Sequence, residues 1–149
     1  MLFTGSWDKM VRCIDLESNK VVKSFIASKE AIKALQITEK YIFVAGCDPI
    51  IRAFNIETGH CKMYQGHKGW VYSMEVHGER LFSGGDDRSI IIWNIESCKQ
   101  LETLLGHENG VTSIGFANND LYTGSFDHFI LCWDLADIEE RVGEKEDMR

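Results

Sequence analysis

A sequence repeat of about 40 residues constrains the fold of this chain more than any other feature. The stretch LFSGGDDRSIIIWNI at 81–95 recurs as LYTGSFDHFILCWDL at 121–135, and weaker copies lie at 2–16 and 41–56. Each copy reads as two short strands joined by a tight turn. A period of this length is typical of folds in which each repeat stacks on its neighbours. The aspartates in the turns of the first to fourth repeats recur at a nearly constant spacing and are Asp8, Asp48, Asp87 and Asp127.

The segments between these copies also repeat. Gly-His pairs at 66–67 and 106–107 are separated by one repeat length, and each precedes a short apolar run, at 71–76 and 111–116. In the second repeat the corresponding segment is Ala27-Ser28, followed by 32–37. A unit of Gly-His, strand, strand with Ser/Thr-Gly, turn Asp and a strand ending in Trp-Asp resembles the WD40 repeat. The resemblance covers almost the whole chain, with two close copies and two degenerate ones.

This resemblance implies an all-β fold, a partial WD40 β-propeller of about four four-stranded blades, two of them incomplete. The segment 28–37, SKEAIKALQI, would suit a short helix if taken alone, but the repeat register favours a strand. The C-terminal residues are rich in charge, so we expect a frayed helix or a disordered segment there. The predicted limits are 1–135 for the WD40 repeats, with blades at about 1–26, 27–65, 66–105 and 106–135, and 136–149 for the charged tail.

The predicted strands do not complete every blade. The first blade lacks its innermost strand, and the last blade lacks its outer strand. Open ends of this kind expose apolar faces and unpaired strand edges, which favour association. We therefore expect further blades from a longer chain, roughly seven by analogy with the family, or self-association in which two chains supply about eight. The chain also begins almost inside a strand, which suggests a fragment or a truncated isoform.

Composition narrows the functional classes. The net charge of −7 disfavours binding to nucleic acid through charge alone, which needs a basic surface. The five cysteines form no CxxC pair, so they read as structural thiols of a reducing compartment. No apolar run is long enough to cross a membrane, and no secretory signal is evident. We expect an intracellular protein of the nucleus, the cytoplasm or both.

The family resemblance also implies buried hydrogen-bond networks in which a histidine bridges the turn aspartate and a Ser or Thr, whose hydroxyl reaches the Trp indole. Ser, His and Asp together could suggest a catalytic triad. The trio recurs once per repeat, however, and it lacks a GxSxG elbow, so a structural role fits better. No phosphate-binding glycine motif or paired metal-ligand spacing is present, which predicts no enzyme, cofactor or metal. The network residues are His67, Ser83, Asp87 and Trp93 in the third repeat, and His107, Thr123, Asp127 and Trp133 in the fourth.

The first two repeats depart from this pattern. Ile14 stands where the later repeats have Trp, and the second repeat has Ala45, Phe54 and Ser28 in place of hydroxyl, Trp and His. These repeats should therefore lack complete networks and depend mainly on apolar packing. We expect the N-terminal half to be the softer one.

Recognition of a partner is the function that remains. Members of the family typically bind proteins or peptides through one rim of loops, and aromatic residues and arginine are enriched in binding hot spots. The alternative for each aromatic residue is packing against a neighbouring loop. Trp70 is the strongest candidate, because its equivalents are Ala31 and Gly110 and the fold needs no large residue there. The candidate rim residues are Trp7, Lys33, Trp70, Tyr72, Asp86, Arg88, Phe126 and His128.

We therefore expect a non-catalytic scaffold that binds a protein or peptide. The last repeats also resemble the WD40 region of a large zinc-finger protein involved in RNA biology, which implies a nuclear, RNA-associated parent. Zinc-finger spacing is absent from this sequence. The alternative function is RNA binding by the rim itself, through Lys33, Trp70, Tyr72 and Arg88.

Overall fold

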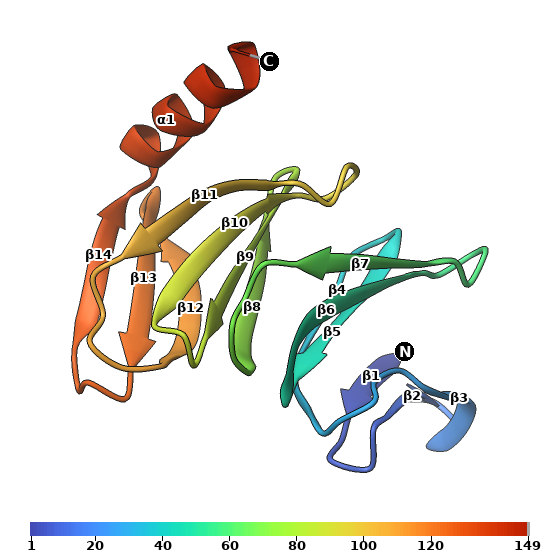
Figure 1. The fold of residues 1–149 in the computed structure, drawn as a ribbon. Helices are drawn as coiled ribbons and strands as arrows, with labels where there is room; N and C mark the ends of the chain where they lie inside the picture. The colour runs from blue at the N-terminus through green and yellow to red at the C-terminus, as the bar shows by residue number, and fades with distance from the viewer. Residues whose placement is uncertain (149) are drawn as a thin grey trace.

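In the described part of the chain, four antiparallel β-sheets follow one another, and one helix comes after the last of them (Figure 1). The computed structural model describes residues 1–148. The middle two sheets have four strands each, while the first and last have three. The strands are β1 Leu2–Gly5, β2 Met10–Asp15, β3 Lys20–Ile26, β4 Ile32–Ile37, β5 Tyr41–Gly46, β6 Asp48–Asn55, β7 Cys61–Gln65, β8 Val71–His77, β9 Arg80–Gly85, β10 Ser89–Asn94, β11 Gln100–Leu105, β12 Val111–Ala117, β13 Asp120–Ser125 and β14 Ile130–Asp134, and α1 spans Leu135–Asp147.

This architecture confirms the predicted fold class, a partial β-propeller with incomplete blades at both ends. The strands at the start of each complete repeat, β4, β8 and β12, lie next to one another, as expected for the inner strands of neighbouring blades. Within the described residues, the first sheet, β1-β2-β3, has no such strand, and the last sheet, β12-β13-β14, has no outer strand. Strand β14 therefore presents an unpaired edge, with Ile130 largely exposed.

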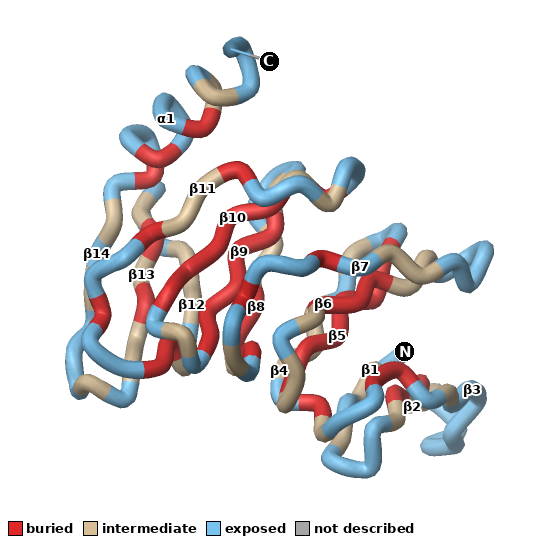
Figure 2. The backbone as a smooth tube through the Cα atoms, viewed as in Figure 1, coloured by how far each residue is buried: buried red, intermediate tan, exposed pale blue. Residues whose placement is uncertain are grey.

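The core consists of three apolar clusters, each formed where neighbouring sheets meet (Figure 2). Ile32 explains why 32–37 is a strand despite its helix-forming composition. Its side chain is buried with Val11 of the first sheet and Val44 of the second, so packing between sheets overrides local propensity.

The turns between the second and third strands of a repeat depend on backbone conformation. Lys9, Arg88 and His128, each directly after a turn aspartate, have positive φ values of 71°, 67° and 73°. Pro49 takes this position in the second repeat, and its ring fixes φ near −65°. The second repeat therefore makes a different turn, in which Gly46 pairs with Asp48 and strand β6 begins at the aspartate itself.

A second recurrent turn position explains the helix. Asp15, Asn55, Asn94 and Asp134 all accept hydrogen bonds from backbone N–H groups two or three residues later. Four places after the first three lie Asn19, Gly59 and Cys98, with φ values of 54°, 72° and 57°, and each returns the chain as an outer strand. Ile138 occupies this position in the last repeat. A β-branched residue strongly disfavours positive φ, so the chain continues as α1.

Helix α1 is docked on the sheets rather than frayed along its length. Leu135, Ile138 and Val142 are buried at 0–1% exposure with residues of the third and fourth sheets. Lys145 forms an ion pair with Glu102 of β11 at 2.5 Å. Of the two expectations for the charged tail, the structure shows a helix, and the apolar residues at 135, 138 and 142 form one face of it.

Among residues 1–148, no helix is long and apolar enough to span a membrane. Within the same range, no three His, Cys, Asp or Glu side chains are grouped so that they could hold a metal ion. All five cysteines are free thiols.

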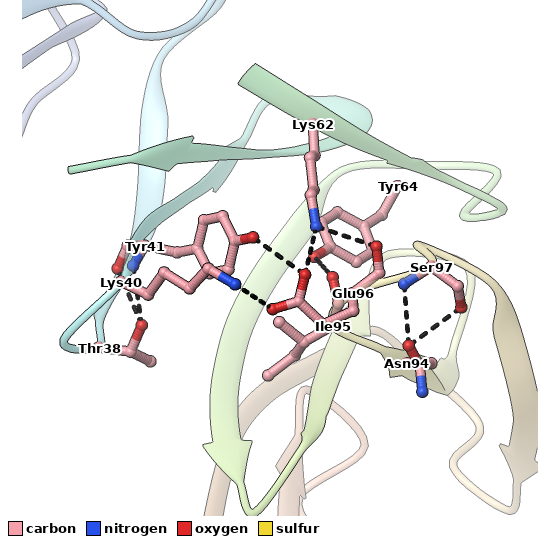
Figure 3. A network of polar contacts seen from close by, with 9 residues as sticks. All are labelled: Thr38, Lys40, Tyr41, Lys62, Tyr64, Asn94, Ile95, Glu96 and Ser97. Atoms are coloured by element: carbon pink, nitrogen blue, oxygen red, sulfur yellow. Dashed lines mark hydrogen bonds and ion pairs between the residues drawn. The ribbon is translucent and has the colours of Figure 1, made fainter. Parts of the chain in front are cut away.

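A polar network joins the second sheet to the third (Figure 3). The Glu96 carboxylate accepts hydrogen bonds from Lys40 at 2.6 Å, Lys62 at 2.8 Å and the Tyr41 hydroxyl at 3.2 Å. Beneath it, the Tyr64 hydroxyl donates to the Ile95 carbonyl at 2.7 Å. The hydrogen bond from Lys40, followed by that from Lys62, lowers the pKa of Glu96 to about 2.

The lowered pKa predicts a pH-dependent contribution to stability. A carboxyl group whose pKa is lower in the folded state stabilises that state above its unfolded pKa, near 4.5. The urea midpoint of the wild type should therefore exceed that of Glu96→Gln at pH 7, and the difference should disappear as the pH falls from about 4.5 toward 2. Because Glu96 is exposed, 1 M salt should also reduce the difference in urea midpoint at pH 7. A difference that persists unchanged at pH 2 would contradict this assignment.

Candidate protein-interaction site

The third repeat brings its four predicted network residues together. Nδ1 of His67 lies 2.9 Å from the Asp87 carboxylate, and Nε2 lies 2.7 Å from the Ser83 hydroxyl. The Trp93 indole N–H donates to the same hydroxyl at 2.8 Å. A His67 tautomer that donates to Asp87 from Nδ1 and accepts from Ser83 at Nε2 satisfies these contacts.

The fourth repeat has the same geometry. His107 lies 2.8 Å from Asp127 and 2.8 Å from Thr123, and the Trp133 indole donates to Thr123 at 2.9 Å. The backbone N–H of Glu108 also donates to Asp127. Each network therefore connects four parts of one blade: the loop before the inner strand, the second strand, the turn after it and the third strand.

These hydroxyl groups are buried and the carboxylate is held by several hydrogen bonds, which argues against a catalytic role for the networks. Ser83 is 0% exposed and Thr123 is 1% exposed, so a substrate could not reach either hydroxyl. Burial raises the pKa of Asp87, but hydrogen bonds from His67, Ser89 and the Lys68 backbone lower it more, so it lies below the usual range. A carboxylate held by so many donors is suited to fixing a turn.

The two degenerate repeats hold their turn aspartates differently. Arg12 forms an ion pair with Asp8 at 2.6 Å, and Arg52 forms one with Asp48 at 2.8 Å. The Arg52 side chain is only 10% exposed. These two pairs were not predicted from the sequence, although each arginine follows its turn aspartate by four residues. The N-terminal repeats therefore replace the histidine network with an ion pair, in addition to apolar packing.

The hydroxyl position of the second repeat was wrongly assigned to Ala45. In the other repeats the hydroxyl residue pairs with the residue four places after the turn aspartate, as Ser83 does with Ile91. Its counterpart in the second repeat is Val44, which pairs with Arg52. The sequence already supports Val44, because Thr4, Ser83 and Thr123 each lie four residues before their turn aspartate, as Val44 lies before Asp48.

On the loop rim, three aromatic side chains from two neighbouring blades meet. The Trp70 and Tyr72 ring centroids are 6.4 Å apart, and those of Tyr72 and Phe126 are 5.6 Å apart, both edge to face. Trp70 is 49% exposed and Phe126 is 56% exposed. Gly110 makes room for this cluster, because a Cβ there would lie 3.0 Å from the Tyr72 ring. We call Trp70, Tyr72 and Phe126 the aromatic cluster.

A carboxylate borders the aromatic cluster. The Tyr72 hydroxyl donates to Asp86 at 2.8 Å, and burial followed by this hydrogen bond raises the pKa of Tyr72 to about 12. Tyr72 therefore stays neutral and holds the acidic side chain beside the exposed rings. Arg88 is exposed on the same turn.

The remaining predicted rim residues do not all join this cluster. Trp7 is 71% exposed, and the Lys33 ammonium lies 4.4 Å from its ring centroid, so these two form a separate pair between the first and second blades. His128 is exposed in the last turn. The structure thus divides the candidates into an aromatic cluster with Asp86 and a Trp7–Lys33 pair.

Comparisons with known proteins agree with this fold and these repeats. The family model described as "WD domain, G-beta repeat" matches residues 59–94 and 98–134. The crystal structure of the WD40 beta propeller domain of Doa1 superposes with a TM-score of 0.79 at 24% identity, covering 87% of this chain and 45% of that chain. The fold is that of a β-propeller built from stacked blades.

Sequence relatives give the same result. Nuclear distribution protein nudF of Aspergillus niger is 31% identical over 93 residues, covering 60% of this chain and 21% of that protein. An uncharacterized WD repeat-containing protein of Schizosaccharomyces pombe is 28% identical over 125 residues, 76% of this chain and 34% of that protein. Ribosome biogenesis protein YTM1 of Kluyveromyces lactis is 29% identical over 101 residues, 58% of this chain and 23% of that protein.

These findings identify residues 59–94 and 98–134 as WD40 repeats, and they show that the chain has the fold of a WD40 β-propeller. The chain spans 21% to 34% of the length of these three relatives. The resemblance to a zinc-finger, RNA-associated parent stays a prediction.

Proposed function

We propose that this chain is a non-catalytic scaffold whose aromatic cluster docks a protein or peptide segment. The observation that carries the proposal is the exposed Trp70. The fold does not require a large side chain at this position, since the equivalent residues are Ala31 and Gly110. Exposed aromatic residues that are braced by their neighbours lose little conformational entropy on binding, which is why they dominate binding hot spots.

The surroundings of the cluster indicate the chemistry of the partner. Asp86 lies beside the aromatic rings, and only its Oδ1 accepts the hydrogen bond from Tyr72. A lysine or arginine side chain could lie over a ring and pair with this carboxylate. The favoured partner is therefore a protein segment that offers a cationic side chain next to an apolar one. An intracellular location, in the nucleus or cytoplasm, belongs to the same proposal.

The test is a selection of binding peptides from a displayed random library, followed by affinity measurement on variants. Trp70→Ala should lower the affinity for the selected peptides by about 30-fold, as expected for a hot-spot residue that contributes about 2 kcal/mol to binding. Trp7→Ala is the matched control, because it removes an equally large exposed ring outside the cluster. Light scattering at the assay concentration should first establish whether one chain or an associated pair forms the rim.

Two results would contradict the proposal. One is equal binding by Trp70→Ala and wild type. The other is the selection of no peptide while a single-stranded RNA binds at low salt, with an affinity that falls steeply as salt rises. The second result would favour the RNA alternative at this rim.

A further inference from the structure

An apolar groove of about 840 Å³ lies between the first and second sheets, on a different part of the molecule from the aromatic cluster. Phe3 and Phe25 line it from the first sheet, and Ile42 and Phe54 line it from the second. The groove is as large as a typical ligand site, but its position in the repeat pattern points to a more specific occupant.

The groove is the repeat equivalent of the space that α1 covers between the third and fourth sheets. The turn aspartates Asp8 and Asp87 are separated along the chain by the same two-repeat shift as Asp48 and Asp127. That shift also relates the groove to the cluster under α1. It relates Phe3, Cys13, Val22, Phe25, Ile37, Ile42, Phe54 and Ile56 of the groove to Phe82, Ile92, Leu101, Leu104, Phe116, Leu121, Trp133 and Leu135 of that cluster.

What differs between the two places is the covering segment. At the C-terminal site, Ile138 of α1 is inserted against the cluster and is 1% exposed. Its equivalent in the groove is Gly59, which has no side chain and no heavy atom within 4 Å of the position where a Cβ would lie. The second repeat turns back at Gly59, so the groove stays open.

The charge at the edge of the site is also reversed. Glu102 pairs with Lys145 of α1, and the equivalent of Glu102 in the groove is Lys23. Both residues have the same strand register, since Glu102 pairs with Ile92 and Lys23 pairs with Cys13. A helix bound in the groove as α1 is bound would therefore need a carboxylate where α1 has Lys145. The other charged residue of the groove, Glu39, corresponds to Asn118.

We propose that this groove docks an amphipathic helix of a partner protein, with apolar residues spaced as Ile138 and Val142 and a carboxylate three residues after the second of them, facing Lys23. The reversed charge argues against α1 of a second copy, whose Lys145 would face Lys23.

The test uses two fluorescent helical peptides and the whole chain. Both peptides carry the sequence of 134–147 with a covalent staple between positions 136 and 140, which are exposed in α1, because a helix this short is marginal alone. One keeps lysine at the position of Lys145, and the other has Lys145→Glu. The glutamate peptide should bind wild type about threefold to tenfold more tightly than the lysine peptide.

The chain variant Lys23→Glu should reverse this preference. Lys20→Glu is the matched control, because it lies on the same exposed strand outside the groove and changes the net charge equally. Methyl NMR should show peptide-dependent shifts at Ile37, Ile42 and Ile56. The proposal would be overturned if neither peptide bound, or if Lys23→Glu left the preference unchanged. It would also be overturned if the peptides shifted the methyl signals of Leu104 and Leu121 instead. A further contrary result would be a chain that dimerises without peptide and, as a dimer, no longer binds either peptide.

Discussion

Replacing Trp93 with alanine is expected to lower the free energy of unfolding by about 3 to 5 kcal/mol. Trp93 is 0% exposed and lies between the second and third sheets, with its ring 5.8 Å from that of Tyr64 and 6.2 Å from that of His67. The alanine variant would leave a cavity and remove the indole donor from the Ser83 hydroxyl. Urea unfolding measures the loss.

Two further variants separate packing from hydrogen bonding. Trp93→Phe keeps much of the ring but loses the N–H donor, so it should cost less, about 1 to 3 kcal/mol. Trp7→Ala removes a tryptophan that is 71% exposed and should change stability by less than about 0.5 kcal/mol. Equal effects of Trp93→Ala and Trp7→Ala would show that the network and its cluster do not stabilise the third blade.

Ile138→Asp is expected to detach α1 from the sheets. The substitution places an unpaired charge among Leu104, Leu121 and Val142, and burying such a group costs several kcal/mol. Undocking avoids that cost and gives up the buried area of the helix, a loss of at least about 2 kcal/mol. Hydrogen exchange should show full loss of protection at 135–147, while strands β8 to β10 stay protected.

Glu140→Ala is the control for this variant, because it changes an exposed residue of the same helix. Protection of α1 should be unchanged in it. If Ile138→Asp also leaves α1 protected, the contact between the helix and the sheets does not hold it in place.

The repeat register made the sheets and both histidine networks predictable from sequence. Asp87 and Asp127 follow their histidines at the same interval along the chain, and equal spacing places equal side chains at equal positions in each blade. The register also favoured a strand at 32–37 where local propensity favoured a helix, and the structure agrees. Repetition therefore carried information that single segments did not.

Contacts between blades were not predictable in this way. Glu96 meets Lys40, which is distant in sequence. Glu96 has repeat equivalents in Glu17 and Glu57, but the equivalent of Lys40 in the next repeat is Glu79, so the repeat spacing does not predict the pair. The bond between Tyr72 of β8 and Asp86 of the turn after β9 lies within the third blade, and it too has no counterpart in the other repeats that the sequence could reveal. The docking of α1 was missed because the high charge of 136–149 hid an apolar face made by only three buried residues.

The groove between the first two sheets became visible only by comparing two places in the same structure. Its residues are ordinary strand residues in sequence, and nothing in their pattern shows that they lack a cover. Gly59 and Ile138 are the informative pair, because they occupy the same repeat position and lead to opposite arrangements.

The residue four places after Asp15, Asn55, Asn94 or Asp134 thus determines the direction in which the chain continues. A residue that accepts positive φ sends the chain back along its own sheet, where the returning segment occupies the edge. Ile138 sends it outward, so one side chain both fastens the helix and leaves β14 without a neighbour. Within residues 1–148, the backbone N–H and C=O groups on the outer side of β14 therefore have no strand to pair with.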